Sequence, residues 1–225
     1  LMMDIIKYFI RFALAAALVA GTSMVPAEEV DICSPFMGGK VDESLLATML
    51  SAADGGHLFR IQQESSQMGF CVDSKLSRIE GIFRDFKGGM ALDPGENGTG
   101  QTMVLIQADS LDTEGEMVER MIKSESFFDV EHYPEVLFVS NGFKWTGPDT
   151  AVLKGHLTLR GITKPVVFNV TLTALDDHPV KDAQKILVKA TTTINRADFG
   201  MEKLASLVNS EVQLCMSVEA LKYSS

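Results

Sequence analysis

The side chains that could do chemistry in this chain are few and widely separated. The four histidines fall in expected loops and on polar strand positions, at His57, His132, His156 and His178. Residues 129–132, Asp-Val-Glu-His, carry metal-binding groups, but four consecutive loop residues cannot all converge on one ion. The sequence contains no nucleophile-elbow, zinc-peptidase, phosphate-loop or dinucleotide-binding motif. We therefore expect no enzymatic activity, no metal site and no catalytic cofactor.

Arg196 is the best candidate for a contact with the polar group of a ligand. It lies in residues 195–200, Asn-Arg-Ala-Asp-Phe-Gly, directly after a stretch of alternating apolar residues. In the favoured interpretation, Arg196 and Asp198 form a local ion pair that fixes a loop, and Phe199 inserts into the end of the fold. In the alternative, Arg196 faces an opening and binds a pyrophosphate or a quinone oxygen, because a guanidinium presents several donors in a fixed geometry.

Residues 155–172, GHLTLRGITKPVVFNVTL, predict the architecture that must position these side chains. Apolar and polar residues alternate on both sides of a short turn at Gly161. This period-two pattern is typical of an antiparallel hairpin with one apolar face. It recurs at residues 189–194 and 212–218, and such ribbons need either a second layer or closure into a barrel.

We expect residues 57–225 to form one all-β domain, a single antiparallel barrel. The expected strands are 58–62, 68–73, 77–86, 89–93, 102–109, 136–141, 152–160, 166–174, 186–194 and 211–221. A short helix is expected between mid-chain strands at residues 113–123, capped by Thr113, and a second one at residues 201–208. Phe127 and Phe128 are expected to close one end of the barrel.

Residues 1–27 have the features of a secretory signal peptide. Lys7 and Arg11 precede the apolar residues 12–20, and Val25 and Ala27 are small residues at the −3 and −1 positions of a cleavage site. We therefore expect cleavage after Ala27 and a periplasmic protein. The alternative is a membrane anchor, for which the apolar run is short.

Residues 28–56 are expected to form an N-terminal extension that contains a short helix. Leu45, Leu46, Met49 and Leu50 make one apolar stripe on that helix. We expect the stripe to pack on the barrel near its first strand. A helix that docks on a partner protein is the alternative.

The acidic balance of the chain limits its partners. The formal net charge is −10 at pH 7. Such a surface repels nucleic acid and anionic lipid headgroups. We expect no nucleic-acid partner and no stable membrane insertion, while a homodimer is compatible with the sequence.

The three cysteines are Cys33, Cys71 and Cys215, and an exported compartment permits disulfides. Cys71 and Cys215 alternate against apolar residues, so each lies on the outer face of its strand. These strands are the first and the last of the barrel and become neighbours when it closes. We therefore expect a Cys71–Cys215 disulfide; a bridge that uses Cys33, or three free thiols, are the alternatives.

Three longer motifs carry a resemblance to a known family. They are SFFDVEHYPEVLF at residues 126–138, GHLTLRGITKPVVFNV at residues 155–170 and ATTTINRADFGM at residues 190–201. With them, the chain resembles the YceI-like family from about Phe59 to Ala220. The resemblance implies a lipocalin-like barrel of about eight main strands, of a bacterial and mostly periplasmic kind that binds isoprenoid lipids.

The resemblance also changes how the inward face of the barrel is interpreted. The residues alone favour a barrel filled by its own side chains, which would suit a stress-response or interaction protein without a ligand. The resemblance implies instead an apolar tunnel that sequesters or carries an isoprenoid of polyprenyl quinone or polyprenyl phosphate type, with Arg196 as a candidate headgroup contact. The tunnel would be lined by Phe70, Val72, Phe83, Ile106, Phe138, Leu157, Leu159, Phe168, Val170, Ile194, Leu214 and Met216.

Overall fold

The structure of the protein is a computed structural model that describes residues 47, 49, 51, 52, 55, 57–92, 100–180 and 182–223, except for the side chain of Asn141. These residues contain the predicted barrel domain apart from residues 93–99, 181, 224 and 225. The predicted signal peptide, most of the predicted extension, and Cys33 with its alternative disulfide lie outside the described residues.

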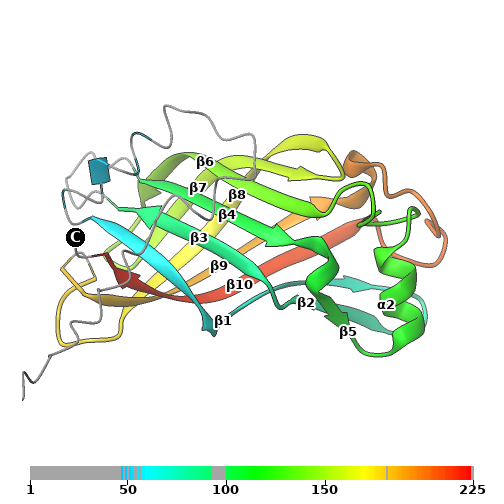
Figure 1. Ribbon diagram of the computed structural model, residues 1–225, viewed down its shortest axis with the longest axis horizontal. Helices are drawn as coiled ribbons and strands as arrows, with labels where there is room; N and C mark the ends of the chain where they lie inside the picture. Colours follow the sequence, from blue (N-terminus) through cyan, green and yellow to red (C-terminus); the bar gives the residue numbers. More distant parts are fainter. Residues whose placement is uncertain are drawn as a thin grey trace, which may run out of the picture. The chain divides into compact units, whose positions relative to one another are not determined.

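Ten strands of the described residues form one antiparallel sheet that closes on itself (Figure 1). The closed ring runs β1–β3–β4–β6–β7–β8–β9–β10, and β10 pairs back onto β1. Its strands are β1 (Leu58–Asp73), β3 (Phe86–Ala91), β4 (Gln101–Gln107), β6 (Glu135–Trp145), β7 (Thr150–Leu159), β8 (Ile162–Ala174), β9 (Lys185–Asn195) and β10 (Glu211–Lys222). The predicted all-β, lipocalin-like antiparallel barrel is confirmed.

The remaining two strands, β2 (Arg78–Phe83) and β5 (Leu111–Thr113), extend the barrel wall beside β1. The first residues of β1 pair with β3 and its last residues pair with β2, while β10 runs along its other side. Residues 63–66 bulge out of the pairing with β10. The sequence predicted two separate strands here because the bulge interrupts the alternation of apolar residues.

The helix predicted at residues 113–123 is present but shorter. Helix α2 (Glu116–Lys123) begins after Gly115, and Thr113 ends strand β5 instead of capping the helix. A strand of three residues is too short for a period-two pattern to identify it. The predicted strand 77–86 is likewise two strands, β2 and β3, because the chain turns at residues 84–85. Within the described part of the chain, no helix is long and apolar enough to cross a bilayer.

The prediction of a second helix at residues 201–208 is wrong. These residues form turns after the short 3-10 helix η3 (Arg196–Phe199), and Val208 forms a β-bridge with Ser74. Leu204 has a positive φ of 57°, which interrupts a right-handed helix. The carbonyl of Lys203 accepts a hydrogen bond from the Arg196 guanidinium at 2.8 Å, so a tertiary contact takes the place of a helical one.

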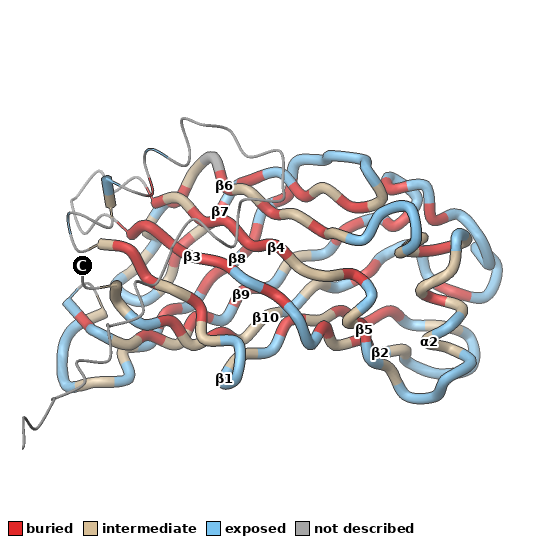
Figure 2. Tube along the Cα trace, viewed as in Figure 1, coloured by how far each residue is buried: buried red, intermediate tan, exposed pale blue. Residues whose placement is uncertain are grey.

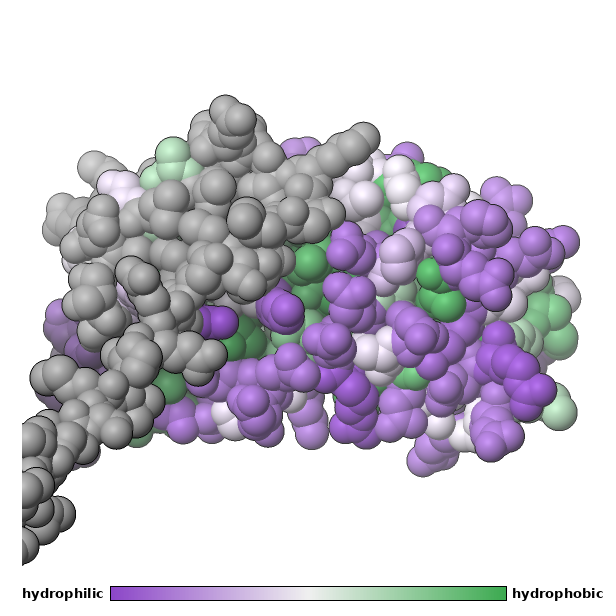
Figure 3. Space-filling view, viewed as in Figure 1, coloured by the Kyte–Doolittle hydropathy of each residue, from purple (hydrophilic) through white to green (hydrophobic). Residues whose placement is uncertain are grey.

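Buried and exposed residues alternate along the barrel strands (Figure 2). In β8, Val166 and Phe168 are buried, whereas Val167 and Asn169 are exposed. The inward side chains belong to one hydrophobic core, and hydrophilic residues cover most of the described surface in view in Figure 3. The alternation predicted for this strand is therefore confirmed.

A smaller apolar cluster lies outside the barrel, where the extension meets the first strand. Met49, at a helical position, is 2% exposed and packs with Leu58, Ala91 and Met103. Leu58 is the first residue of β1, so the part of the stripe that is described lies where it was expected. Leu45, Leu46 and Leu50 lie outside the described residues.

The predicted disulfide is not present, since Cys71 and Cys215 are both free thiols. Their strands are neighbours as expected, but Cys71 lies opposite Gln213, and Cys215 lies opposite Gly69. The two cysteines are therefore diagonal neighbours, which are farther apart than a directly opposed pair. The Cys71 thiol donates to Gln213 Oε1 at 3.3 Å and accepts from Arg78 Nη2 at 2.6 Å.

Candidate functional site

Two adjoining apolar pockets lie inside the barrel. We call the pocket that includes residues of α2 and of the loop after η3 the end pocket, and the one between the barrel strands the inner pocket. The cavity volume of each pocket is about 60 Å³. Both are lined by Phe70, Phe128, Leu159, Ile194 and Leu214, so they are parts of one apolar cavity.

Most of the side chains predicted to line a tunnel do line this cavity. Besides four of the shared residues, the end pocket contains Val72, and the inner pocket contains Phe83, Ile106, Phe138, Leu157, Phe168 and Met216. Val170 is the exception, because it is buried in the core but lines neither pocket. The period-two pattern therefore assigned most of the lining strand residues to the inward face, although Cys215, which it assigned to the outer face, also lines the inner pocket.

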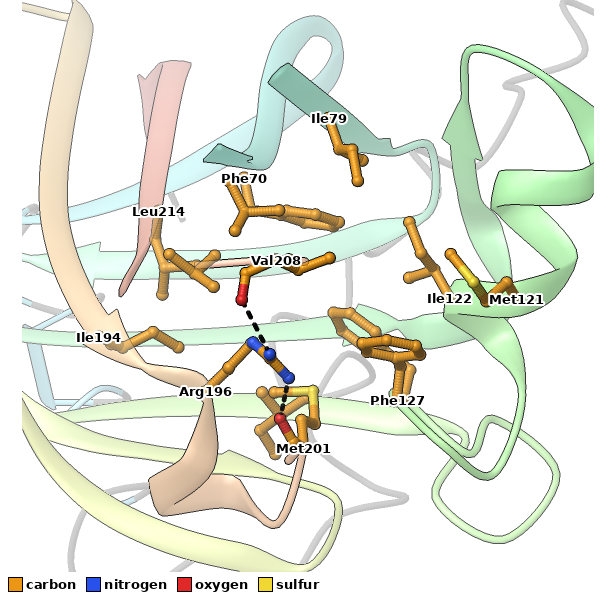
Figure 4. A pocket seen from close by; sticks show the side chains of 14 residues that line it. Phe70, Ile79, Met121, Ile122, Phe127, Ile194, Arg196, Met201, Val208 and Leu214 are labelled. Carbon is orange, nitrogen blue, oxygen red and sulfur yellow. Dashed lines mark hydrogen bonds between the residues drawn. The ribbon is translucent and has the colours of Figure 1, made fainter. Parts of the chain in front are cut away.

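The end pocket also has lining residues that no strand pattern could identify. Met121 and Ile122 come from α2, Phe127 from the segment that follows it, and Met201 and Val208 from the loop after η3 (Figure 4). These residues lie in short, non-periodic segments that converge only in the folded chain. The signal in the sequence was the Phe127-Phe128 pair.

Three phenylalanines meet where the two pockets join. Phe128 stacks on Phe70 with 5.7 Å between ring centroids, and Phe83 lies 5.8 Å from Phe128 and 6.2 Å from Phe70. The backbone leaves room for the Phe70 ring at Gly81, where an added Cβ would lie 2.5 Å from Phe70 Cε1. The aromatic cluster therefore lies at the junction of the two pockets.

Arg196 lines the end pocket, but its donors point to the backbone. It is 4% exposed, and its guanidinium donates to the carbonyls of Met201, Lys203, Val208 and Asn209. Figure 4 shows the bonds to Met201 and Val208. Burial lowers the pKa of Arg196 from its ordinary value. The charge is therefore stabilised by carbonyl dipoles, and these contacts hold the loop after η3 against the barrel.

The ion pair expected between Arg196 and Asp198 does not form, because Asp198 is exposed and Arg196 bonds to carbonyls instead. Phe199, by contrast, is inserted as expected, with 1% of its surface exposed. The Phe127 ring lies over the guanidinium, 5.9 Å from its centre. Arg196 thus combines the predicted loop-fixing role with a position in the pocket wall.

Arg160 ties together three segments around the end pocket. It forms the β7–β8 turn with Gly161, and both residues have positive φ, 52° and 69°. Arg160 Nη1 donates to the carbonyl of Gly200 at 2.6 Å, and Nη2 donates to the carbonyl of Glu125 at 3.1 Å. The turn, the loop after η3 and the segment after α2 are thereby linked.

The chemistry available at this cavity is that of an apolar binding site. Within the described ranges, no group of three or more His, Cys, Asp or Glu residues is placed to hold a metal ion. His132 lies away from the pockets, with Nδ1 2.8 Å from Asp129 Oδ1, and this hydrogen bond raises the pKa of the imidazole. The cavity has an apolar lining and presents no nucleophile–base pair from the described residues.

Comparison with known proteins finds relatives over the same region. The model of the YceI-like domain matches residues 59–220. A UPF0312 protein of Pseudomonas putida (strain W619) is 32% identical over 207 residues, which cover 92% of this chain and 96% of that protein. A UPF0312 protein of Azotobacter vinelandii is 28% identical over 180 residues, which cover 80% of this chain and 90% of that protein.

Solved structures share the fold at low sequence identity. BcnA from Burkholderia cenocepacia superposes with a TM-score of 0.62 at 22% identity, over 71% of this chain and 98% of BcnA. A polyisoprenoid-binding domain from Saccharophagus degradans superposes with a TM-score of 0.57 at 15% identity, over 73% of this chain and 98% of that domain. At these identities the similarity establishes the barrel architecture.

Proposed function

Because the chain belongs to the YceI-like family, we propose that it is a periplasmic lipid-binding protein that sequesters or carries an isoprenoid chain. The isoprenoid occupies the inner pocket and extends through the end pocket toward α2, and the lining side chains move apart to admit it, because each pocket has a volume of about 60 Å³. The protein holds this molecule without transforming it chemically. Export follows from the signal peptide predicted at residues 1–27.

The observation that carries this proposal is the continuous apolar lining of the two pockets. Aromatic and aliphatic side chains from the barrel strands, α2 and the loop after η3 all face the same cavity. Each methylene-sized group withdrawn from water contributes about 0.8 kcal/mol, so a long hydrocarbon can bind with few directed contacts. The shared fold of the Saccharophagus degradans domain, which is a polyisoprenoid-binding domain, supports the same ligand class.

The surroundings of Arg196 favour an uncharged headgroup. Among the described residues, Arg196 is the one charged residue that lines either pocket, and its guanidinium is already bonded to four carbonyls. A phosphate or pyrophosphate brought to this wall would lose its hydration without gaining enough donors. A quinone needs only one or two donors for its oxygens. We therefore favour the polyprenyl quinone type over the polyprenyl phosphate type.

Lipid extraction from the native protein tests the proposal. The protein is isolated from the periplasm of its own host without detergent, extracted with organic solvent and analysed by mass spectrometry. We expect an isoprenoid at roughly one molecule per chain, as a single cavity of this kind allows. Protein that yields no apolar molecule above the level of the solvent blank would count against the proposal.

The location is tested separately by the mass and N-terminal sequence of the same material. We expect the mature chain to begin at Glu28 and to be released with the soluble periplasmic fraction. Retention of residues 1–27 in the membrane fraction would identify the segment as an anchor.

A further inference from the structure

Two segments that line the end pocket also carry leucines on the outer surface. The β1–β2 turn lies between Val72 and Ile79, which both line the pocket, and it exposes Leu76 to 93%. The loop after η3 exposes Leu204 to 41% and Leu207 to 46%. We call Leu76, Leu204 and Leu207 the apolar rim. Exposed apolar surface also interrupts the hydrophilic surface near α2 in Figure 3.

The backbone holds the two segments side by side. The amide of Lys75 donates to the carbonyl of Leu207 at 2.9 Å, and Ser74 forms a β-bridge with Val208. Leu204 has a left-handed backbone conformation, with φ of 57°, which is unfavourable for an L-residue and more often accommodates Gly or Asn. The fold thus keeps a strained, apolar residue at an exposed tip, next to a second apolar tip.

Each tip is preceded by a lysine. Lys75 and Lys203 are exposed, and neither forms an ion pair with another described residue. The acidic residues nearest to these lysines in the sequence are Asp73 and Glu202. Asp73 pairs with Arg78 at 3.1 Å. Leucines flanked by unpaired lysines suit the boundary of a lipid bilayer, where acyl chains lie below headgroup phosphates.

We propose that the apolar rim docks the protein on the surface of a phospholipid bilayer. The three leucines insert among the headgroups and the first acyl carbons, and Lys75 and Lys203 meet lipid phosphates. The inference rests on the proposed function, because a bilayer supplies or receives an isoprenoid lipid and residues that flank both leucine-bearing tips line the end pocket. The net charge of −10 opposes association with anionic surfaces, so docking is weak and reversible.

Co-sedimentation of the exported chain with vesicles of phosphatidylethanolamine and phosphatidylglycerol tests this docking. Replacing Leu76 and Leu207 by Ser is expected to lower the vesicle partition coefficient roughly tenfold, since two inserted apolar side chains are lost. The matched control replaces Val167 and Leu175 by Ser, because these residues are exposed to 49% and 42% but lie outside the rim. The control should bind vesicles as the unmodified protein does.

Several results would overturn the docking proposal. One is that the unmodified protein does not sediment with vesicles. Another is that the rim variant and the control variant lose vesicle binding equally. Loss of a homodimer or of a protein complex in the rim variant, without vesicle binding by the unmodified protein, would assign the rim to a protein partner instead.

Lipid content separates this inference from the proposed function. The rim variant should contain as much isoprenoid as the unmodified protein, because its substitutions lie outside the cavity. If the unmodified protein contains isoprenoid but does not bind vesicles, the docking proposal alone is refuted. If it binds vesicles through the rim but contains no isoprenoid, the lipid-carriage proposal alone is refuted.

Discussion

Phe128 stacks on Phe70 with a ring-centroid distance of 5.7 Å and an interplanar angle of 28°. Phe70 belongs to the barrel strand β1, whereas Phe128 belongs to the segment between α2 and β6. Both rings line both pockets, so the stack lies at their junction. The stack therefore joins the barrel wall to the segment after α2 at the junction of the two pockets.

Replacement of Gly81 by Ala should disturb this junction. The new Cβ would lie 2.5 Å from Phe70 Cε1 and 2.8 Å from Leu111 Cδ1, so the Phe70 ring must move. We expect a loss of about 1–3 kcal/mol of unfolding free energy, as for other overpacked cores, together with lower isoprenoid content. Urea unfolding and lipid extraction measure the two effects.

Gly142→Ala is the matched control, because an added Cβ there would meet only Lys154 Cβ, at 3.9 Å. Its stability and lipid content should stay close to those of the unmodified protein. Equal losses in the two variants would mean that the glycines act through backbone freedom rather than through the Phe70 ring.

Neighbouring residues of β8 test the direction of the inward face. Phe168 is 2% exposed and lines the inner pocket, so Phe168→Asp buries an unpaired charge. We expect this variant to lose at least about 4 kcal/mol of stability, or to fail to fold. Val167→Asp should cost less than about 1 kcal/mol, since Val167 is 49% exposed. Thermal unfolding measures the loss of stability in both variants. Similar losses at positions 167 and 168 would contradict the assignment of Phe168 to the inner face and Val167 to the outer face.

The alternation in β7 and β8 could be predicted from sequence because these long strands have one buried and one exposed face. The stagger of Cys71 and Cys215 could not, because a period-two pattern assigns a face but leaves the register across two distant strands undetermined. The turns at residues 201–208 escaped prediction because Arg196, outside that segment, binds its carbonyls. The end-pocket residues Met121 and Met201 were missed for a related reason, since short loops and one helix bring them together.

Arg196→Met should destabilise the loop after η3. Four backbone carbonyls lose a charged donor in a site where the side chain is 4% exposed, so we expect a loss of about 3 kcal/mol or more. Arg84→Met is the control, because Arg84 is exposed and pairs with Asp112 at 2.7 Å, an interaction worth less than about 1 kcal/mol. If Arg196→Met instead keeps its stability and loses only bound lipid, Arg196 is a headgroup contact.

The His132–Asp129 pair predicts a small pH dependence. The hydrogen bond that the His132 imidazole donates to Asp129 Oδ1 raises the folded-state pKa of His132 above its unfolded value of 6.5. The stabilisation is therefore fully present below pH 6.5 and is lost as the pH rises through the folded-state pKa. An NMR titration should give a His132 midpoint above 6.5, and Asp129→Asn should return it toward that value. A midpoint unchanged by Asp129→Asn would refute the pairing.

Met49→Ala tests whether the extension stabilises the barrel without taking part in lipid binding. Met49 is 2% exposed against Leu58 and Met103, so we expect a loss of about 2 kcal/mol and unchanged isoprenoid content. Met117→Ala, at an 82% exposed position, is the control and should change neither quantity. A Met49 variant that empties the barrel at full stability would show that the extension covers the cavity.

A crystal structure of protein purified from its native periplasm, without added ligand, tests the central claim most directly. We predict continuous, elongated electron density that begins beside Phe168 in the inner pocket, passes the Phe70–Phe128 stack and ends near Arg196. A cavity in which the protein's own side chains fill this path, with no density for a bound chain, would contradict the account.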